Sequence, residues 1–167
     1  RETKEGVGMT RRYKLSHLSA DGRARMVDVG GKPSTVRMAR ATVTVKLGKN
    51  IASALKRTGV LTKGNVIETA RIAGIMAAKC TGSLIPMCHP LPLDFVAVDT
   101  RWHGDSLQIE TTARCVARTG VEMEALVAAS IAALTVYDMC KSADKGIAIS
   151  GLRLLEKSGG KSGHWRR

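Results

Sequence analysis

A thiol and an imidazole stand side by side in a loop that prolines hold at both ends. Pro86 and Pro90 bracket the adjacent Cys88 and His89, and Met87 precedes them. Because proline fixes φ and removes a backbone donor, these side chains are presented from a stiff loop. Such a loop, at the end of a packed helix, is a suitable place for a ligand or a proton-transfer group. A structural turn with one buried cysteine explains the same residues equally well.

A long helix predicted downstream carries carboxylates near both of its ends. Glu122 and Glu124 stand in its first turn, where carboxylates favour the helix N-terminus. Asp138 and Lys141 stand near its end, three residues apart, which is the spacing of an ordinary surface ion pair. The residues between are mostly Ala, Val, Leu, Ile and Ser, a composition that predicts burial. Buried carboxylates and lysines must be paired or functional.

Glu124 and Asp138 lie on the same side of this helix but far apart. They are fourteen residues apart, close to four turns, which separates them by roughly 20 Å along the axis. One small-molecule site can hardly use both ends of a single helix. If both groups are catalytic, the sites must therefore be shared between subunits.

The basic residues predict an anionic partner. The net charge is +13, of which residues 1–14 and 157–167 contribute +3 and +4. Only five aromatic residues are present, so stacking platforms for bases are scarce, and a small anionic ligand is favoured over a nucleic acid. Lys63 lies in a loop before a helix N-terminus, which is a good position for an anion. Arg37 starts a strand and Lys157 ends another.

The segment after Lys157 is rich in Gly, Lys and Ser. It lacks the GxxxxGK[ST] spacing and the following helix of a P-loop, so that interpretation is weak. A flexible tail that contacts an anion and a disordered terminus both remain open. Residues 1–14 are polar and without apolar periodicity, which is typical of a mobile tail.

Apolar periodicity predicts a mixed order of strands and helices. Strands are expected at 23–29, 36–47, 91–102, 106–117 and 147–155, the last with a bulge at Ser150 and Gly151. Helices are expected at 50–58, 66–80 and 120–142. Without the first short strand, the order is β-α-β-β-α-β, which predicts an α+β, ferredoxin-like antiparallel sheet with helices on one face.

One domain is expected, covering residues 15–157 between the N-terminal tail 1–14 and the Gly/Lys-rich C-terminal tail 158–167. Strand 91–102 carries apolar residues on both faces, with Val96 and Val98 opposite Phe95 and Ala97. A wide apolar face is rarely left exposed to water, so we expect the sheet to drive oligomerisation.

The cysteine pattern predicts a reducing compartment. The four cysteines form no CxxC pair, and the chain shows no signal-peptide pattern and no run of about 18 apolar residues. We therefore expect a cytoplasmic protein with no membrane segment. Because the sequence begins at Arg1, a mitochondrial location is the alternative if an upstream targeting segment has been removed.

Five segments together carry a resemblance to a known family. They read ARIAGIMAAK, LIPMCHPLPL, TGVEMEAL, ALTVYDMCK and LLEKSGGKSG. The chain resembles, over about residues 15–163, the cyclic pyranopterin monophosphate synthase family, also called the molybdenum cofactor biosynthesis protein C family. One departure is Lys63-Gly64-Asn65, where the family commonly reads Lys-Gly-Asp; Asn caps a helix as well as Asp does.

The resemblance implies a lyase that converts 3′,8-cyclo-7,8-dihydroguanosine 5′-triphosphate to cyclic pyranopterin monophosphate and releases diphosphate. It also implies a homo-hexamer, a trimer of dimers, with sites at subunit interfaces. No metal site and no cofactor is expected for the chemistry, although Mg²⁺ could accompany the triphosphate. A nucleic-acid-binding module and a non-catalytic scaffold are the rival classes, and the intact set of motif residues argues against the scaffold.

The resemblance also assigns roles to individual residues. Lys63, Asp138 and Lys141 are expected to be catalytic, with the two lysines closest to the proton transfers. The expected substrate-binding residues are Arg37, Met87, Cys88, His89, Glu122, Met123, Glu124 and Lys157. A lysine transfers protons near neutral pH only if burial or neighbouring cations depress its pKa.

Overall fold

The computed structural model describes residues 22–167, so the predicted tail at 1–14 lies outside the described residues. The strands are β1 (Thr35–Lys46), β2 (Val60–Leu61), β3 (Gly64–Asn65), β4 (Phe95–His103), β5 (Ser106–Ala117), β6 (Ala148–Ser158) and β7 (Trp165–Arg166). The helices are α1 (Lys49–Thr58), α2 (Val66–Lys79), α3 (Thr81–Leu84) and α4 (Glu122–Cys140). The α+β class expected from the sequence is confirmed.

A five-stranded antiparallel sheet forms one layer of the molecule. Its strand order is β4-β5-β1-β6-β7, with β1 in the centre, paired along its whole length with β5. Alternate residues of β1, from Ala39 through Val43 to Val45, are fully buried, because the period of two turns one side of the strand toward the core. β4 and β5 meet in a hairpin at Gly104, whose φ of 58° suits a residue without a Cβ atom.

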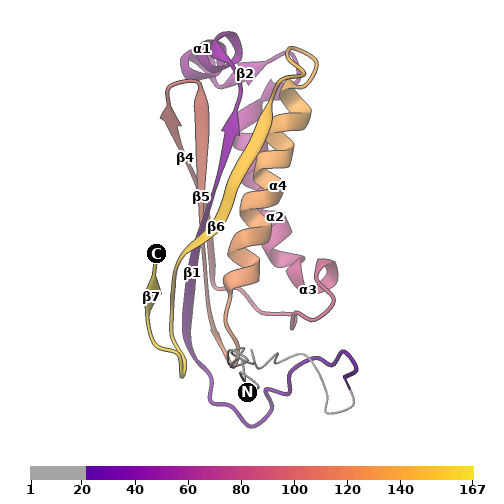
Figure 1. The fold of residues 1–167 in the computed structure, drawn as a ribbon, viewed down its shortest axis with the longest axis vertical. Helices are drawn as coiled ribbons and strands as arrows, with labels where there is room; N and C mark the ends of the chain where they lie inside the picture. Colours follow the sequence, from indigo (N-terminus) through magenta and orange to yellow (C-terminus); the bar gives the residue numbers. More distant parts are fainter. Residues whose placement is uncertain (1–21) are drawn as a thin grey trace, which may run out of the picture.

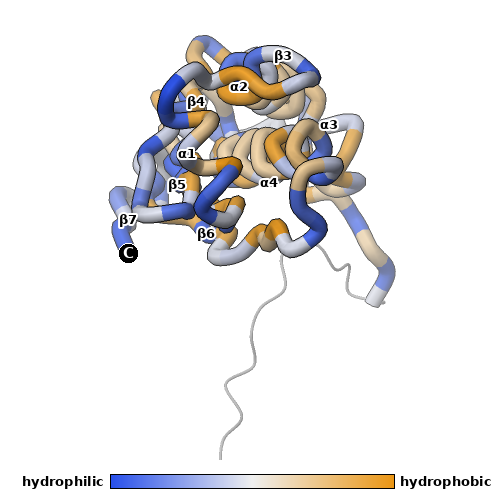
Figure 2. Tube along the Cα trace, turned by 90° about the horizontal axis from the view of Figure 1, so that it is seen from above, coloured by the Kyte–Doolittle hydropathy of each residue, from blue (hydrophilic) through white to orange (hydrophobic). Residues whose placement is uncertain are grey.

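Two long helices cover one face of this sheet. Helix α4 packs on β1, β5 and β6, and α2 packs on α4 and β4. Figure 1 shows both helices on the same side, with α4 running nearly the full height of the sheet. Seen from above in Figure 2, α4 lies in the middle of the molecule and is coloured as mainly hydrophobic. The helices approach closely because Gly74 of α2 lies against α4.

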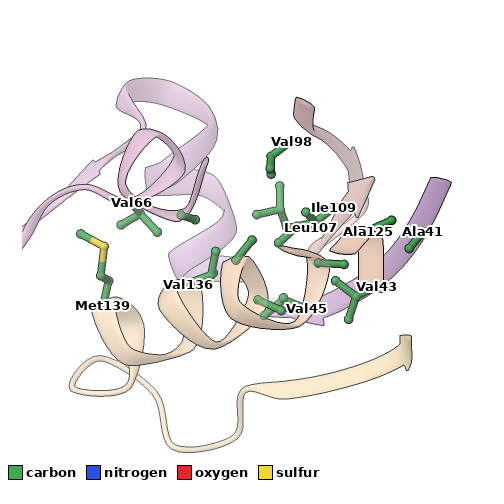
Figure 3. Close-up of a cluster of buried hydrophobic side chains, with 14 of the residues drawn as sticks. Ala41, Val43, Val45, Val66, Val98, Leu107, Ile109, Ala125, Val136 and Met139 are labelled. Carbon is green, nitrogen blue, oxygen red and sulfur yellow. The ribbon is translucent and has the colours of Figure 1, made fainter. Parts of the chain in front are cut away.

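The core lies between the helices and the sheet. Figure 3 shows its side chains converging from both layers, with Val43, Val45 and Ile109 of the sheet near Ala125 and Val136 of α4. Small residues dominate the buried side of α4, which lets the helix lie close to the strands. Ten of its nineteen residues are buried, so a helix that is long and apolar enough to span a membrane serves here as a core helix.

Most predicted elements are confirmed, with limits that shift by a few residues. The strand predicted at 106–117 matches β5, and the bulge predicted at Ser150 and Gly151 is confirmed by a register shift between β1 and β6 at that point. Asn65 caps α2 as expected, accepting a hydrogen bond from the Glu68 amide at 3.0 Å. The strand predicted at 91–102 begins only at Phe95.

The short strand predicted at 23–29 is wrong. That segment contains one isolated bridge residue, Ala24, and otherwise no regular structure. Alternating residues form a strand only where a neighbouring edge can pair with them. At the other end of the chain, β7 folds back on β6 and pairs Trp165 with Lys157, which periodicity did not predict.

The open face of the sheet is mixed: charged side chains occupy its middle, and exposed apolar side chains, Val36 paired with Val116, lie near one end. The guanidinium of Arg40 donates hydrogen bonds to Glu110 and, at 2.9 Å, to Glu156. The one large aromatic on this face, Phe95, is covered by the guanidinium of Arg114 at 4.4 Å from its ring centroid. The expectation that this face drives oligomerisation stays a prediction. Further exposed apolar side chains lie on α2, at Ile72 and Met76.

Candidate active site

The first half of the site lies where the β2–β3 hairpin meets the end of α4. The turn of that hairpin carries Lys63, whose Nζ donates to the backbone oxygen of Asp138 at 3.0 Å and lies 3.6 Å from its Oδ2. The Nζ of Lys141 lies 2.6 Å from Oδ1 of the same carboxylate. The structure thus brings together all three residues that were predicted to be catalytic. One carboxylate lies between two ammonium groups.

This arrangement favours the charged forms of Asp138 and Lys141. The hydrogen bond and charge of Lys141, followed by the charge of Lys63, lower the pKa of Asp138. The carboxylate of Asp138 raises the pKa of Lys141, which stays a cation and a proton donor in the single chain. The three side chains are 45 to 59% exposed. At Lys141, the depressed pKa that base catalysis by a lysine requires is therefore not produced by this chain alone.

The second half of the site is a cavity of about 340 Å³ at the other end of α4. The loop after α3 forms one wall, where the Cys88 amide donates to the Ile85 oxygen at 3.0 Å and tightens the turn. The first turn of α4 forms the opposite wall. The predicted residues that line this cavity are Met87, Cys88, His89, Glu122, Met123 and Glu124.

Glu124 is the buried charge of this half-site. Its side chain is 3% exposed, and burial, assisted by the charge of Glu122, raises its pKa. Burial and the nearby Glu124 also raise the pKa of the Cys88 thiol, which argues against a thiolate nucleophile. A carboxyl group with a raised pKa is suited to exchange protons near neutral pH.

Arg37 and Lys157 lie beside this cavity. Lys157 pairs with Glu122 at 2.8 Å, and both line a small pocket of about 70 Å³ together with Arg37. The guanidinium of Arg37 donates to the backbone oxygens of Ala117 at 3.3 Å and Arg118 at 3.5 Å. These contacts hold two cations at the edge of the cavity.

The two half-sites are separated by the length of α4. Asp138 and Glu124 stand near opposite ends of α4, about 21 Å apart along its axis, and Figure 1 shows the length of this helix beside the sheet. Each end gathers groups that could exchange protons, and neither end holds all of them. The structure therefore brings the predicted residues together in two groups rather than in one.

Sequence reasoning missed several residues that line the cavity. Thr119 and Gly120 belong to the TGVEMEAL motif, which could have indicated them. The prediction from this motif included only its charged and sulfur-containing residues. Lys32 lies outside every motif, and only the fold places it at the cavity mouth. Within residues 22–167, no group of three or more His, Cys, Asp or Glu side chains is arranged to hold a metal ion.

Fold and site together define an α+β protein whose long central helix carries acid–base groups at both ends. The sequence profile of the MoaC family matches residues 26–160. The chain therefore belongs to the MoaC family.

Relatives from distant bacteria are similar over nearly the whole chain. A protein of Novosphingobium aromaticivorans, named cyclic pyranopterin monophosphate synthase, is 54% identical over 152 residues, covering 91% of this chain and 96% of the relative. A protein of the same name from Thermomicrobium roseum is 53% identical, covering 92% and 93%. A third, from Peptoclostridium acidaminophilum, is 46% identical, covering 92% and 98%.

Proposed function

We propose that this protein is a cyclic pyranopterin monophosphate synthase of molybdenum cofactor biosynthesis. It converts 3′,8-cyclo-7,8-dihydroguanosine 5′-triphosphate to cyclic pyranopterin monophosphate and releases diphosphate. The observation that carries the proposal is the contact of Asp138 with both Lys63 and Lys141, in a chain whose relatives carry that enzyme's name. The net charge of +13 suits a triphosphate substrate.

The two half-sites divide the chemistry between them. The reaction opens the purine ring hydrolytically, rebuilds a pterin and forms a cyclic phosphate. Lys63 and Lys141, held by Asp138, exchange protons with the reacting ring. Glu124 and His89 exchange protons with it from the opposite side of the site. Attack of a substrate hydroxyl oxygen on the α-phosphorus expels diphosphate, and Arg37 and Lys157 stabilise the charge of that leaving group.

A complete site requires two chains. We propose that the Lys63–Asp138–Lys141 group of one subunit closes over the Glu124 cavity of another, in a homo-hexamer built as a trimer of dimers. The separation of the two groups along α4 supports this arrangement, as do the exposed Ile72 and Met76 on α2. Burial under a second subunit would also depress the lysine pKa values toward neutrality. The strand order β4-β5-β1-β6 supports a ferredoxin-like classification of the subunit.

We further propose that the chemistry needs no resident cofactor and that Mg²⁺, where it acts, arrives with the triphosphate. The free state of all four cysteines is consistent with a cytoplasmic protein. Adding a chelator to the assay should then slow turnover only as far as it strips the metal from the nucleotide.

The decisive experiment supplies the purified protein with the cyclised guanosine triphosphate and follows the release of diphosphate and of the pterin product. The wild-type protein should turn over, and Asp138→Asn should lose most of that activity. Arg101→Gln, on the open face of the sheet, removes a charge remote from both half-sites and should behave as wild type. No product from a correctly assembled wild-type protein would refute the proposed function.

A further inference from the structure

Gly120 lies just before α4, and the carboxylate of Glu122 occupies the space where a larger residue would carry its side chain. A Cβ atom on Gly120 would stand 1.9 Å from Oε2 of Glu122 and 2.7 Å from its Cδ. The three atoms nearest to that Cβ position all belong to Glu122. Carbon atoms that are not bonded prefer a separation of about 3.5–4.0 Å, so the two side chains exclude each other.

The usual reasons for a glycine near a helix start do not account for Gly120. It is not among the glycines with a positive φ, so no left-handed backbone requires it. Glycine is also a common N-cap residue, but the N-cap of α4 is Val121. The helix N-terminus attracts the charge of Glu122 in its first turn. Gly120 leaves room for that carboxylate to fold back over the helix start.

In this position Glu122 joins α4 to the end of β6. Its Oε1 accepts a hydrogen bond from Nζ of Lys157 at 2.8 Å, and both side chains are about one-third exposed. Gly120, Glu122 and Lys157 line the same pocket of about 70 Å³. A Glu122 carboxylate pushed out of this pocket would leave Lys157 without its partner.

The same carboxylate acts on Glu124. Gly120, Glu122 and Glu124 all line the cavity of about 340 Å³. Burial is the main cause that raises the pKa of Glu124, and the negative charge of Glu122 raises it further. The location of the Glu122 carboxylate therefore influences both a cation and an acid–base group of the candidate active site.

Other elements also present titratable or charged groups to Glu124. They are Cys88 and His89 from the loop after α3, Cys115 from β5 and Lys32 from the segment before β1. None of these groups is among the atoms nearest to the Cβ position of Gly120. A substitution at Gly120 that alters the titration of Glu124 therefore acts through Glu122.

We infer that Gly120 is a positioning residue of the candidate active site, because the space left by its missing side chain holds the Glu122 carboxylate against Lys157. The inference rests on the proposed function, in which Glu122 and Lys157 bind the substrate and Glu124 exchanges protons. Gly120 itself touches no reacting atom. It acts through the side chain two residues along the chain.

Gly120→Ala tests this role with a single methyl group. In the assembled protein it should raise KM for the cyclised guanosine triphosphate by about three- to tenfold, the loss of one charge-assisted contact, and should change kcat less. Its melting temperature should stay within about 2 °C of wild type, since the exposed pair adds little stability. Gly31→Ala is the matched control, because Gly31 also lacks a positive φ and a Cβ atom there would meet nothing within 4 Å.

NMR titration of protein with ¹³C-labelled glutamate carboxyl groups provides a readout that does not need turnover. The signal of Glu124, assigned by its absence in Glu124→Gln, should titrate at lower pH in Gly120→Ala than in wild type. The reason is that a displaced Glu122 no longer adds its negative charge to the effect of burial. Gly31→Ala should titrate as wild type.

A double-mutant cycle separates positioning from a structural role. In the background of Glu122→Ala there is no carboxylate to displace, so adding Gly120→Ala should change neither KM nor the titration of Glu124. A further loss in that background would show that the glycine serves the backbone, and would overturn the inference.

The outcomes also distinguish this inference from the proposed function. Wild-type KM and wild-type titration of Glu124 in Gly120→Ala would overturn the positioning role, whether or not the protein turns over. A titration that shifts in Gly120→Ala but not in the Glu122→Ala background, in a protein without turnover, would support the positioning role and refute the proposed reaction.

Discussion

Asp138 accepts contacts from two ammonium groups at once, and each of the three side chains is substantially exposed in the single chain. Exposed ion pairs contribute little to stability, so these groups are not needed for the fold. We expect Lys63→Ala and Lys141→Ala to lower kcat by at least about 100-fold, the usual loss of a general acid or base. The melting temperature should stay within about 2 °C of wild type.

Lys141→Arg sharpens this prediction. Arginine keeps the positive charge but holds its proton too tightly to transfer it near neutral pH. If Lys141 transfers a proton, Lys141→Arg should be nearly as inactive as Lys141→Ala. Recovery of wild-type activity by arginine, measured as diphosphate release, would show that charge alone is required.

Glu124 should make stability depend on pH in a defined direction. Its folded pKa is raised above the ordinary value of 4.5, so its contribution to stability is fully present below about pH 4.5 and is lost as pH rises through the folded pKa. Glu124→Gln removes this pH-dependent loss of stability. The melting temperature of the variant minus that of wild type should therefore increase above about pH 4.5 and then reach a plateau. A difference that does not change between pH 4 and pH 8 would contradict the burial of this carboxylate as the cause.

At the residue scale, charged residues within motifs and a partner at helical spacing could be predicted from the sequence, whereas partners from distant segments could not. The i, i+3 pair of Asp138 and Lys141 follows from helical spacing alone. That Lys63 reaches the same carboxylate depends on a two-residue hairpin with no periodicity to reveal it. Lys32 joins the cavity only because distant segments converge at one end of the sheet.

At the element scale, the close contact of α2 with α4 depends on one glycine. A Cβ atom on Gly74 would stand 3.0 Å from both the Ala128 oxygen and a methyl carbon of Val98. Gly74→Val should therefore force the helices apart, at a cost of about 1–3 kcal/mol for overpacking. We expect the melting temperature to fall by roughly 3–10 °C.

Lys79→Val provides the control for that substitution. Lys79 is exposed at the end of the same helix, so the variant introduces the same β-branched side chain without the collision. Its melting temperature should change far less than that of Gly74→Val in calorimetry. Equal losses would attribute the effect to the helix propensity of valine and not to packing.

The long elements were predictable because their periodicity is set by which side is buried. β5 alternates without interruption and its limits were predicted to the residue. β7 has only two residues and exists because the edge of β6 offers hydrogen-bond partners, which no local pattern records. The contact of Arg114 with Phe95 could not be predicted from the apolar residues of β4, because the arginine comes from the neighbouring strand β5.

At the scale of the whole molecule, a composite site predicts that two inactive variants can repair one another. Asp138→Ala and Glu124→Ala should each be inactive when purified alone. Mixed under conditions of subunit exchange, they should regain partial activity, since some sites would combine an intact Asp138 with an intact Glu124 from different chains. Diphosphate release during the exchange provides the measurement.

Mass spectrometry of isotopically distinct subunits would verify that exchange has occurred. Complete exchange without any recovery would count against a site shared between chains. A mixture of Asp138→Ala with the double variant Asp138→Ala/Glu124→Ala is the control and should remain inactive, because no chain then supplies Asp138.

The span of α4 has a consequence for populations that contain both defective and normal copies of the chain. If each site takes one end of the helix from each of two neighbours, a subunit damaged at one end disables only the sites that need that end. Activity would then fall in simple proportion to the damaged fraction. A subunit damaged at both ends spoils two sites, so activity would fall with the square of the normal fraction. A double lesion introduced beside a normal gene copy would thus be more dominant than either single lesion.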